Sequence, residues 1–227
     1  MRFQQFVVVA LIAVLTLASC ATARSEDSAT GAWSLETVNS RSEFSMSWSD
    51  ATGDHENDSS SDVDIHALGI DAALASSGSH VKFAQHRESG DCTYEGWVAN
   101  GNGGGTFVYT PNGAFFDYVR KRGLVVDSMS QQLRALVLDV TRRYVDSILA
   151  TGVKLDTFHD VLRLRAMNVD SGYIHDLASV GFAHLDAHDY LRLKALNVDS
   201  TYIKYLQGHG MSNLTVREVV RLKAQQI

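Results

Sequence analysis

The chain has 227 residues, 45% of them hydrophobic, and a formal net charge of -6. This composition is sufficient for a buried core, so it excludes a wholly disordered chain. Residues 21–111 carry 4 basic and 14 acidic side chains, whereas residues 112–227 carry 15 basic and 12 acidic ones. The change in character near residue 111 predicts a boundary between two parts of the chain.

Residues 1–20 have the pattern of a bacterial lipoprotein signal peptide. A basic start, Met1-Arg2, precedes an apolar run over residues 6–18. This run is too short to cross a bilayer, which needs about 20 residues, but it fits the apolar region of a signal peptide. Residues 17–20 (Leu-Ala-Ser-Cys) resemble a lipobox, so Cys20 is predicted to be acylated. The alternative is a plain secreted protein in which Cys20 is incidental.

A lipidated Cys20 sets the expected location. Two or more acyl chains hold a protein stably on a membrane, so we expect an exported chain, lipid-anchored in the bacterial cell envelope and facing the periplasm. Ala21 follows the cysteine, which resembles outer-membrane sorting in a double-membraned bacterium. Residues 21–30 are small and polar, as in a tether. Cys92 would then be the one remaining cysteine, and we expect it to be a small buried hydrophobe.

Residues 31–111 predict an antiparallel β-module. Apolar residues alternate with polar ones, the period of half-buried strands. The alternating positions are Trp33, Leu35, Thr37; Phe44, Met46, Trp48; Val81, Phe83; Cys92, Tyr94, Gly96, Val98; and Phe107, Tyr109. The glycine-rich residues 100–105 predict a hairpin turn. Residues 50–64 are acidic and serine-rich, and predict a disordered loop. We expect four or five strands that pack on the following part.

Residues 112–227 repeat every 29 residues, in units 112–140, 141–169, 170–198 and 199–227. Each unit predicts two helices with polar N-caps and a glycine that ends the first helix. The N-caps are Asn112, Thr141, Asp170, Asp199 for the first helices and Ser128, Thr157, Asp186, Thr215 for the second; the glycines are Gly123, Gly152, Gly181 and Gly210. The expected fold class is α+β, a small antiparallel β-sheet module followed by a short α-solenoid of four 29-residue helical hairpins.

A row of cations repeats with the same period. Its members are Arg134, Arg163, Arg192 and Arg221, accompanied by Arg165, Lys194 and Lys223. If these side chains project on one side, this basic ladder could bind an acidic peptide, phosphate or lipid headgroups. The alternative is that the arginines pair with the acids three residues before them, Asp160, Asp189 and Glu218, which is the commoner use of such charges.

Motifs for catalysis and metal binding are missing from the sequence. His55-Glu56 lacks the second histidine of a zinc-peptidase helix, because Ser59 stands in its place. His184 and His188 flank Asp186, which starts a helix, so they should not share one helical face. We therefore predict a chain that is not an enzyme and has no catalytic residues, cofactor or metal. A hydrolase with an unrecognised site around Cys92 or His86 remains an alternative.

Two segments resemble a known family. Residues 173–181 (YIHDLASVG) and 185–194 (LDAHDYLRLK) resemble helical repeats found behind bla-regulator-type membrane metallopeptidases and in stand-alone bacterial envelope proteins. Residues 96–111 resemble the small β-module that can precede those repeats. The chain lacks the peptidase's His-Glu-x-x-His motif and membrane helices, so the resemblance implies no catalytic residue. It implies an accessory or sensory module.

The sequence favours a lipid-anchored, envelope-facing interaction or scaffold protein that binds a protein or peptide partner through its helical repeats. One alternative is an accessory or sensory module for a membrane peptidase or an envelope-stress signalling system. The unrecognised hydrolase is the other. The lipid anchor provides the expected contact with the membrane, and a net-acidic exported chain is not expected to bind nucleic acid.

Overall fold

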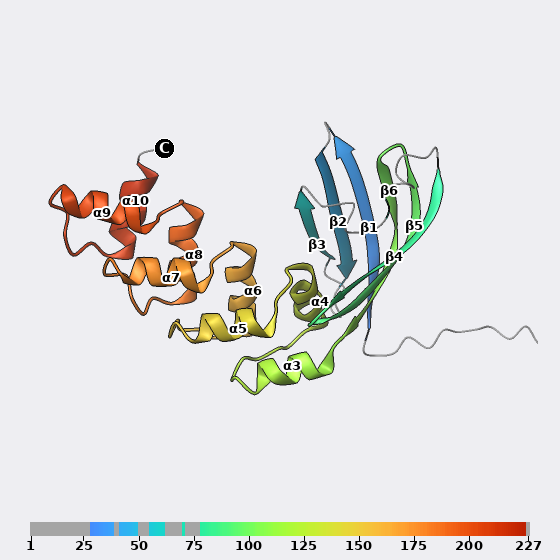
Figure 1. Cartoon of the computed structure of the whole chain (residues 1–227), viewed down its shortest axis with the longest axis horizontal. Coiled ribbons are helices and arrows are strands. Elements are labelled where there is room, and N and C mark those ends of the chain that lie inside the picture. Colours follow the sequence, from blue (N-terminus) through green and yellow to red (C-terminus); the bar gives the residue numbers. More distant parts are fainter. Residues whose placement is uncertain (1–27, 39–40, 50–54, 62–69, 71–77, 226–227) are drawn as a thin grey trace, which may run out of the picture.

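A computed structural model describes residues 28–38, 41–49, 55–61, 70 and 78–225. One six-stranded antiparallel sheet precedes a series of short helices that extends away from it (Figure 1). The strands are β1 (Ala29–Val38), β2 (Arg41–Ser49), β3 (His55–Ser61), β4 (Ser79–Arg87), β5 (Gly90–Ala99) and β6 (Asn102–Pro111). Their order across the sheet is β3-β2-β1-β6-β5-β4. The predicted signal peptide and Cys20 lie outside the described residues.

The sheet buries one of its faces, as the alternating pattern predicts. In β5, buried and exposed residues alternate from Gly90 to Val98, because neighbouring side chains on a strand point to opposite faces. The apolar positions predicted for the core are buried: Trp33, Leu35, Phe44, Met46, Trp48, Val81, Phe83, Cys92, Tyr94, Val98, Phe107 and Tyr109. Aromatic rings dominate this core, and Phe83 stacks on Tyr94 with ring centroids 4.7 Å apart.

The hairpin between β5 and β6 is confirmed, but its turn is shorter than residues 100–105. The turn consists of Asn100 and Gly101, whose φ values are 50° and 80°. Positive φ at both central residues is typical of a type I′ turn, which matches the twist of the flanking strands. The following glycines 103–105 belong to β6.

The prediction of a disordered loop over residues 50–64 was wrong for its central part. Residues His55–Ser61 form β3, an edge strand that pairs with β2 from Glu43 opposite Ser61 to Ser49 opposite His55. The absence of apolar periodicity misled the prediction, because an edge strand can be held by main-chain hydrogen bonds without burying alternate side chains. The rest of the segment lies outside the described residues.

Eight helices follow the sheet within the described residues. They are α3 (Gly113–Arg120), α4 (Met129–Val137), α5 (Arg142–Leu149), α6 (Phe158–Ala166), α7 (Ser171–Ala178), α8 (Ala187–Ala195), α9 (Ser200–Gly208) and α10 (Val216–Ala224). All eight predicted N-cap residues are confirmed at the starts of these helices. The four predicted glycines have φ between 75° and 100°, the left-handed geometry that ends a helix.

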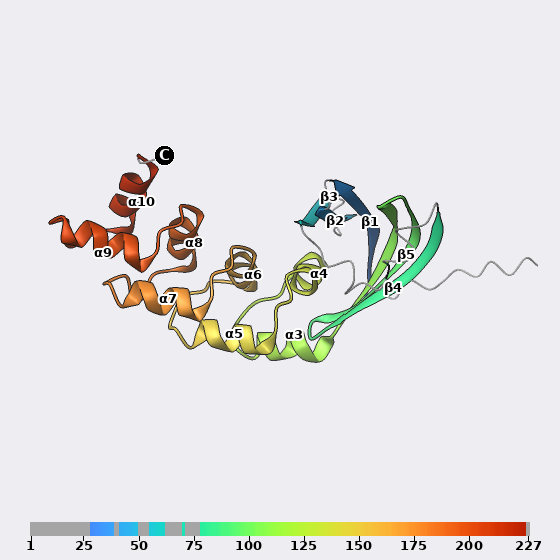
Figure 2. The same ribbon diagram turned by 45° about the horizontal axis from the view of Figure 1, so that its top comes forward.

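The predicted arrangement of these helices, a short α-solenoid of four 29-residue helical hairpins, was wrong. Such a hairpin requires the two helices of one unit to lie antiparallel against each other. The helices instead are eight separate short elements, and their most extensive contacts join alternate helices: α3 with α5, α4 with α6, α6 with α8 and α8 with α10. Figure 2 shows odd-numbered and even-numbered helices in two rows.

The repeat could not predict this packing, because contacts within a unit and contacts between units recur with the same period. Helices of eight or nine residues make only about two turns. Each therefore offers a short apolar stripe, and the loop over residues 121–128 is long enough to place α4 in a different row from α3.

Helix α4 joins the sheet to the helices. Its Leu133 and Leu136 belong to the sheet's hydrophobic core, whereas Ala135 belongs to the helical core. Polar contacts reinforce the joint: Trp48 Nε1 donates to Ser130 Oγ at 3.0 Å, and Arg87 Nη1 donates to the Leu136 carbonyl at 2.7 Å. None of the described helices is long and apolar enough to span a membrane.

Candidate functional site

The four arginines of the basic ladder lie on the even-numbered helices, Arg134 on α4, Arg163 on α6, Arg192 on α8 and Arg221 on α10. They occupy equivalent positions, because each arginine lies six residues after the N-cap residue of its helix. Because α4, α6, α8 and α10 contact one another in sequence, the arginines follow one row of helices. Arg163, Arg192 and Arg221 are exposed, and Arg134 is half-buried.

Two members of the ladder line one groove between α6 and α8. This α6–α8 groove has a volume of about 380 Å³ and is lined by Arg163, Ala166, Met167, His188, Leu191, Arg192 and Ala195. Most of the lining is apolar, and the two guanidinium groups supply its fixed positive charge. A smaller cavity of about 170 Å³ between α4 and α6 includes Arg134 and His159. The α6–α8 groove can therefore accept a group that is apolar at one end and anionic at the other.

Ion pairs within the helices involve only one of the two groove arginines. Arg192 Nη1 lies 3.9 Å from Asp189 Oδ1, as the self-pairing alternative requires. Asp160 instead accepts hydrogen bonds from the backbone N–H groups of Asp156 and Thr157, at 2.9 and 3.1 Å. No ion pair to Arg163 is found among the described residues, so this guanidinium is available to an anionic ligand.

At the last helix, Glu218 can likewise either cap the helix or pair with an arginine. The backbone N–H of Thr215 donates to its carboxylate at 2.8 Å. This hydrogen bond is the main reason that the pKa of Glu218 is lowered, and nearby Arg221 contributes less. The acidic residue therefore acts mainly as part of a capping box, with Arg221 as a weaker partner.

The accompanying cations have a different role from the arginine ladder. The Arg165 guanidinium carbon lies 5.2 Å from the ring centroid of Tyr144, while the Nζ atoms of Lys194 and Lys223 lie 4.5 and 4.4 Å from those of Tyr173 and Tyr202. Arg165 Nε also donates to the Leu138 carbonyl at 2.9 Å. These half-buried side chains hold neighbouring helices together through cation–π contacts. They do not line the α6–α8 groove.

The sequence reasoning missed these tyrosine contacts, although the repeat contains their signal. Each tyrosine precedes its cation by 21 residues, and one such pair occurs in each of the units 141–169, 170–198 and 199–227. The tyrosine hydroxyls add a second link, because Tyr144 Oη donates to the Val169 carbonyl and Tyr173 Oη to the Val198 carbonyl, both at 2.8 Å. A repeated pair at constant spacing can thus predict contact between the two helices of one unit.

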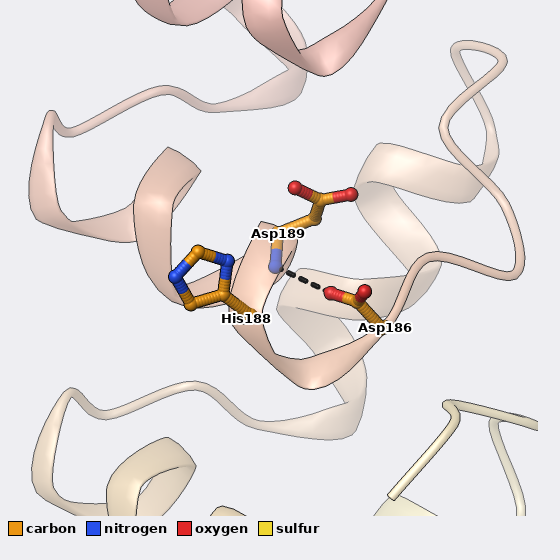
Figure 3. A group of neighbouring side chains, drawn as sticks. All are labelled: Asp186, His188 and Asp189. Atoms are coloured by element: carbon orange, nitrogen blue, oxygen red, sulfur yellow. Dashed lines mark hydrogen bonds between the residues drawn. The ribbon is translucent and has the colours of Figure 1, made fainter.

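Asp186, His188 and Asp189 gather at the start of α8, where one potential ligand atom from each lies within 4.8 Å of the others (Figure 3). Asp186 Oδ1 already accepts a hydrogen bond from the Asp189 backbone N–H at 2.8 Å. Asp189 is also the partner of Arg192. Helix capping and ion pairing therefore account for the cluster, and His184, which the sequence analysis weighed together with His188, is not a member of it.

The two residues of the alternative hydrolase site lie on opposite faces of the sheet. Cys92 is buried on the inner face, with no exposed surface, whereas His86 is exposed and its Nδ1 lies 2.7 Å from Asp91 Oδ1. Burial raises the pKa of Cys92 to about 12, so its sulfur stays protonated at neutral pH. This arrangement cannot make a Cys–His pair, and the expected buried cysteine is confirmed.

We expect Cys92 to resist alkylation in the folded protein. A thiol that is buried and protonated supplies almost no thiolate to a reagent such as iodoacetamide. Mass spectrometry after a timed reaction at mildly alkaline pH should find Cys92 unmodified in folded protein and fully modified in denaturant. Rapid modification without denaturant would show that Cys92 is accessible.

Comparisons of the chain with models of protein families, with curated proteins and with solved structures find no match. The resemblance to repeats of bla-regulator-type metallopeptidases therefore stays a prediction from the residues quoted for it.

Proposed function

We propose that this chain is a lipid-anchored interaction protein of the bacterial cell envelope, which binds an acidic, partly apolar peptide segment in the α6–α8 groove. The observation that carries the proposal is the placement of Arg163 and Arg192 on one groove whose remaining lining is largely apolar. Acylation of Cys20 would keep the protein at the membrane surface, where its partner is another envelope protein.

The lining favours a peptide over other anionic ligands. Guanidinium groups bind carboxylates through paired hydrogen bonds, which orient the ligand as well as attract it. Met167 and Leu191 offer apolar contact, and the flexible methionine side chain can adapt to different partners. A polyphosphate or nucleic acid would use the arginines but leave this apolar surface uncovered. A segment with Asp or Glu beside Leu or Phe uses both.

The double variant Arg163→Gln, Arg192→Gln is expected to weaken peptide binding by about tenfold or more, since each lost charge contact contributes on the order of 1 kcal/mol. Peptides that bind the wild-type chain are first selected from a displayed random library. Fluorescence anisotropy with the selected acidic peptides then measures the affinity of each variant. Affinity of the wild type should also fall as salt rises, because the attraction is electrostatic.

A matched control removes the same charge elsewhere. Arg143→Gln, Lys204→Gln changes two exposed cations on the odd-numbered helices α5 and α9. This variant should retain the wild-type affinity. Equal losses in both double variants would attribute binding to net charge alone, and selection of peptides without acidic residues would contradict the proposal.

A further inference from the structure

Among the residues that the structure describes, the outer face of the sheet carries one large exposed hydrophobic aromatic side chain, Trp97, which is 64% exposed. The other two tryptophans of the chain, Trp33 and Trp48, are 2% and 3% exposed and lie in the core. Leaving this ring in water forgoes the free energy that burial of its apolar surface would provide. Trp97 lies near the end of β5, beside polar residues of β4 and β5, so a ligand that covers the ring would gain that free energy.

On the β4 side, polar groups support Trp97. His80 is its direct cross-strand neighbour, and the two rings meet edge to face with centroids 5.6 Å apart and an interplanar angle of 74°. His80 Nε2 lies 3.2 Å from Glu95 Oε1, and Lys82 Nζ lies 3.8 Å from Glu95 Oε2. The indole therefore stands beside hydrogen-bonding groups whose charges are close to balanced.

On the β6 side, no side chain projects from the strand position directly beside Trp97. The direct cross-strand neighbour is Gly104, and the next strand contributes Ser34 at the same level. An added Cβ at Gly104 would meet only the Trp33 carbonyl oxygen within 4 Å, at 3.3 Å. No side chain of a described residue therefore occupies this position, and a ligand ring can lie along the sheet next to the indole.

We infer that this outer-face platform, formed by Trp97, His80, Lys82, Glu95, Gly104 and Ser34, binds a glycan built of equatorially substituted pyranose rings. Such rings present flat C–H faces that stack on an indole, while their equatorial hydroxyl and amide groups reach the surrounding carboxylate, imidazole and hydroxyl groups. Protein ligands bind best where several apolar anchors cluster, but this platform has one anchor among polar neighbours. Its balanced charge likewise disfavours a polyanion.

The test uses the full chain in mild detergent and a soluble oligosaccharide of β-1,4-linked N-acetylglucosamine. Because Trp97 is the exposed tryptophan of the three, iodide should quench chiefly its fluorescence. Bound oligosaccharide should shield the indole and reduce this quenching, and calorimetry gives the affinity. The same experiment with maltooligosaccharide, whose axial linkages break the flat faces, should give weaker protection.

Variants assign the binding to the platform. Trp97→Ala should weaken binding by about fivefold, and Trp97→Phe should retain part of the affinity, because stacking on a large ring contributes on the order of 1 kcal/mol. Gly104→Val should also weaken binding by placing a branched side chain beside the indole. Val108→Ala alters another exposed apolar residue on the same face and should bind normally. Far-UV circular dichroism establishes that each variant is folded.

The inference is independent of the α6–α8 groove, so the Arg163→Gln, Arg192→Gln variant should bind the oligosaccharide as the wild type does. Failure of the wild type to bind it would overturn the inference while leaving peptide binding untouched. Unchanged affinity in both Trp97→Ala and Gly104→Val would overturn it as well.

Discussion

Replacing Phe158 with alanine is expected to destabilise the protein by about 3–5 kcal/mol, the range for truncating a fully buried aromatic side chain. Phe158 has no exposed surface and begins α6, where its ring meets that of Phe116 edge to face with centroids 6.2 Å apart. Its removal leaves a cavity between the two rows of helices. Urea unfolding followed by far-UV circular dichroism measures the loss, which is a large share of the usual stability of a domain.

The neighbouring residue provides the control. His159 follows Phe158 on α6 and is exposed, so His159→Ala should change the unfolding free energy by less than about 0.5 kcal/mol. The two variants share a helix and differ in burial. Similar midpoints for Phe158→Ala and the wild type would contradict the assignment of Phe158 to the helical core.

Local structure could be predicted from the sequence with good accuracy because its causes are local. A polar side chain at an N-cap acts on backbone N–H groups two or three residues away, as Asp199 does on Tyr202 at 2.8 Å. Gly181 ends α7 by adopting a φ of 100°, which depends on its own missing side chain. The buried positions of the strands also follow from neighbouring residues, through the alternation of the pleat.

Three left-handed helix ends escaped notice because glycine is absent there. Asp139, Asn168 and Asn197 have φ values of 51°, 51° and 52° after α4, α6 and α8. Their recurrence every 29 residues is the signal that could have revealed them, since Asn and Asp tolerate this conformation better than other residues with side chains. The same repeat did not reveal which helices pack together, because that choice depends on contacts between units.

The candidate site was predictable only in outline. The spacing of Arg163 and Arg192 indicated a shared row, but the apolar lining between them comes from Met167 and Leu191 on two helices whose pairing was mispredicted. Arg165 shares the 29-residue spacing of its row, but its guanidinium group lies over the ring of Tyr144. Equal spacing along the chain cannot separate a cation that faces a groove from one that covers an aromatic ring.

Leu136→Ala is expected to weaken the joint between the sheet and the helices, with a loss of about 2–5 kcal/mol. Leu136 lies on α4 with no exposed surface, and its side chain belongs to the core of the sheet together with Trp33 and Trp48. The emission of these buried tryptophans therefore reports on the core that loses packing. In urea, the midpoint of their fluorescence change should move to lower concentration.

The comparison that isolates this effect is Val125→Ala, which removes apolar atoms from a side chain that is 58% exposed and should leave the midpoint unchanged. Leu136→Ala should keep most of the helical signal in the absence of urea, because the N-cap of α4 at Ser128 and the contact of Ala135 with the helical core are retained. If the urea midpoint of the far-UV circular dichroism signal fell while the midpoint of the tryptophan fluorescence did not, Leu136 would belong to the helical core. The observed packing requires the opposite, since α4 contributes Leu133 and Leu136 to the sheet side.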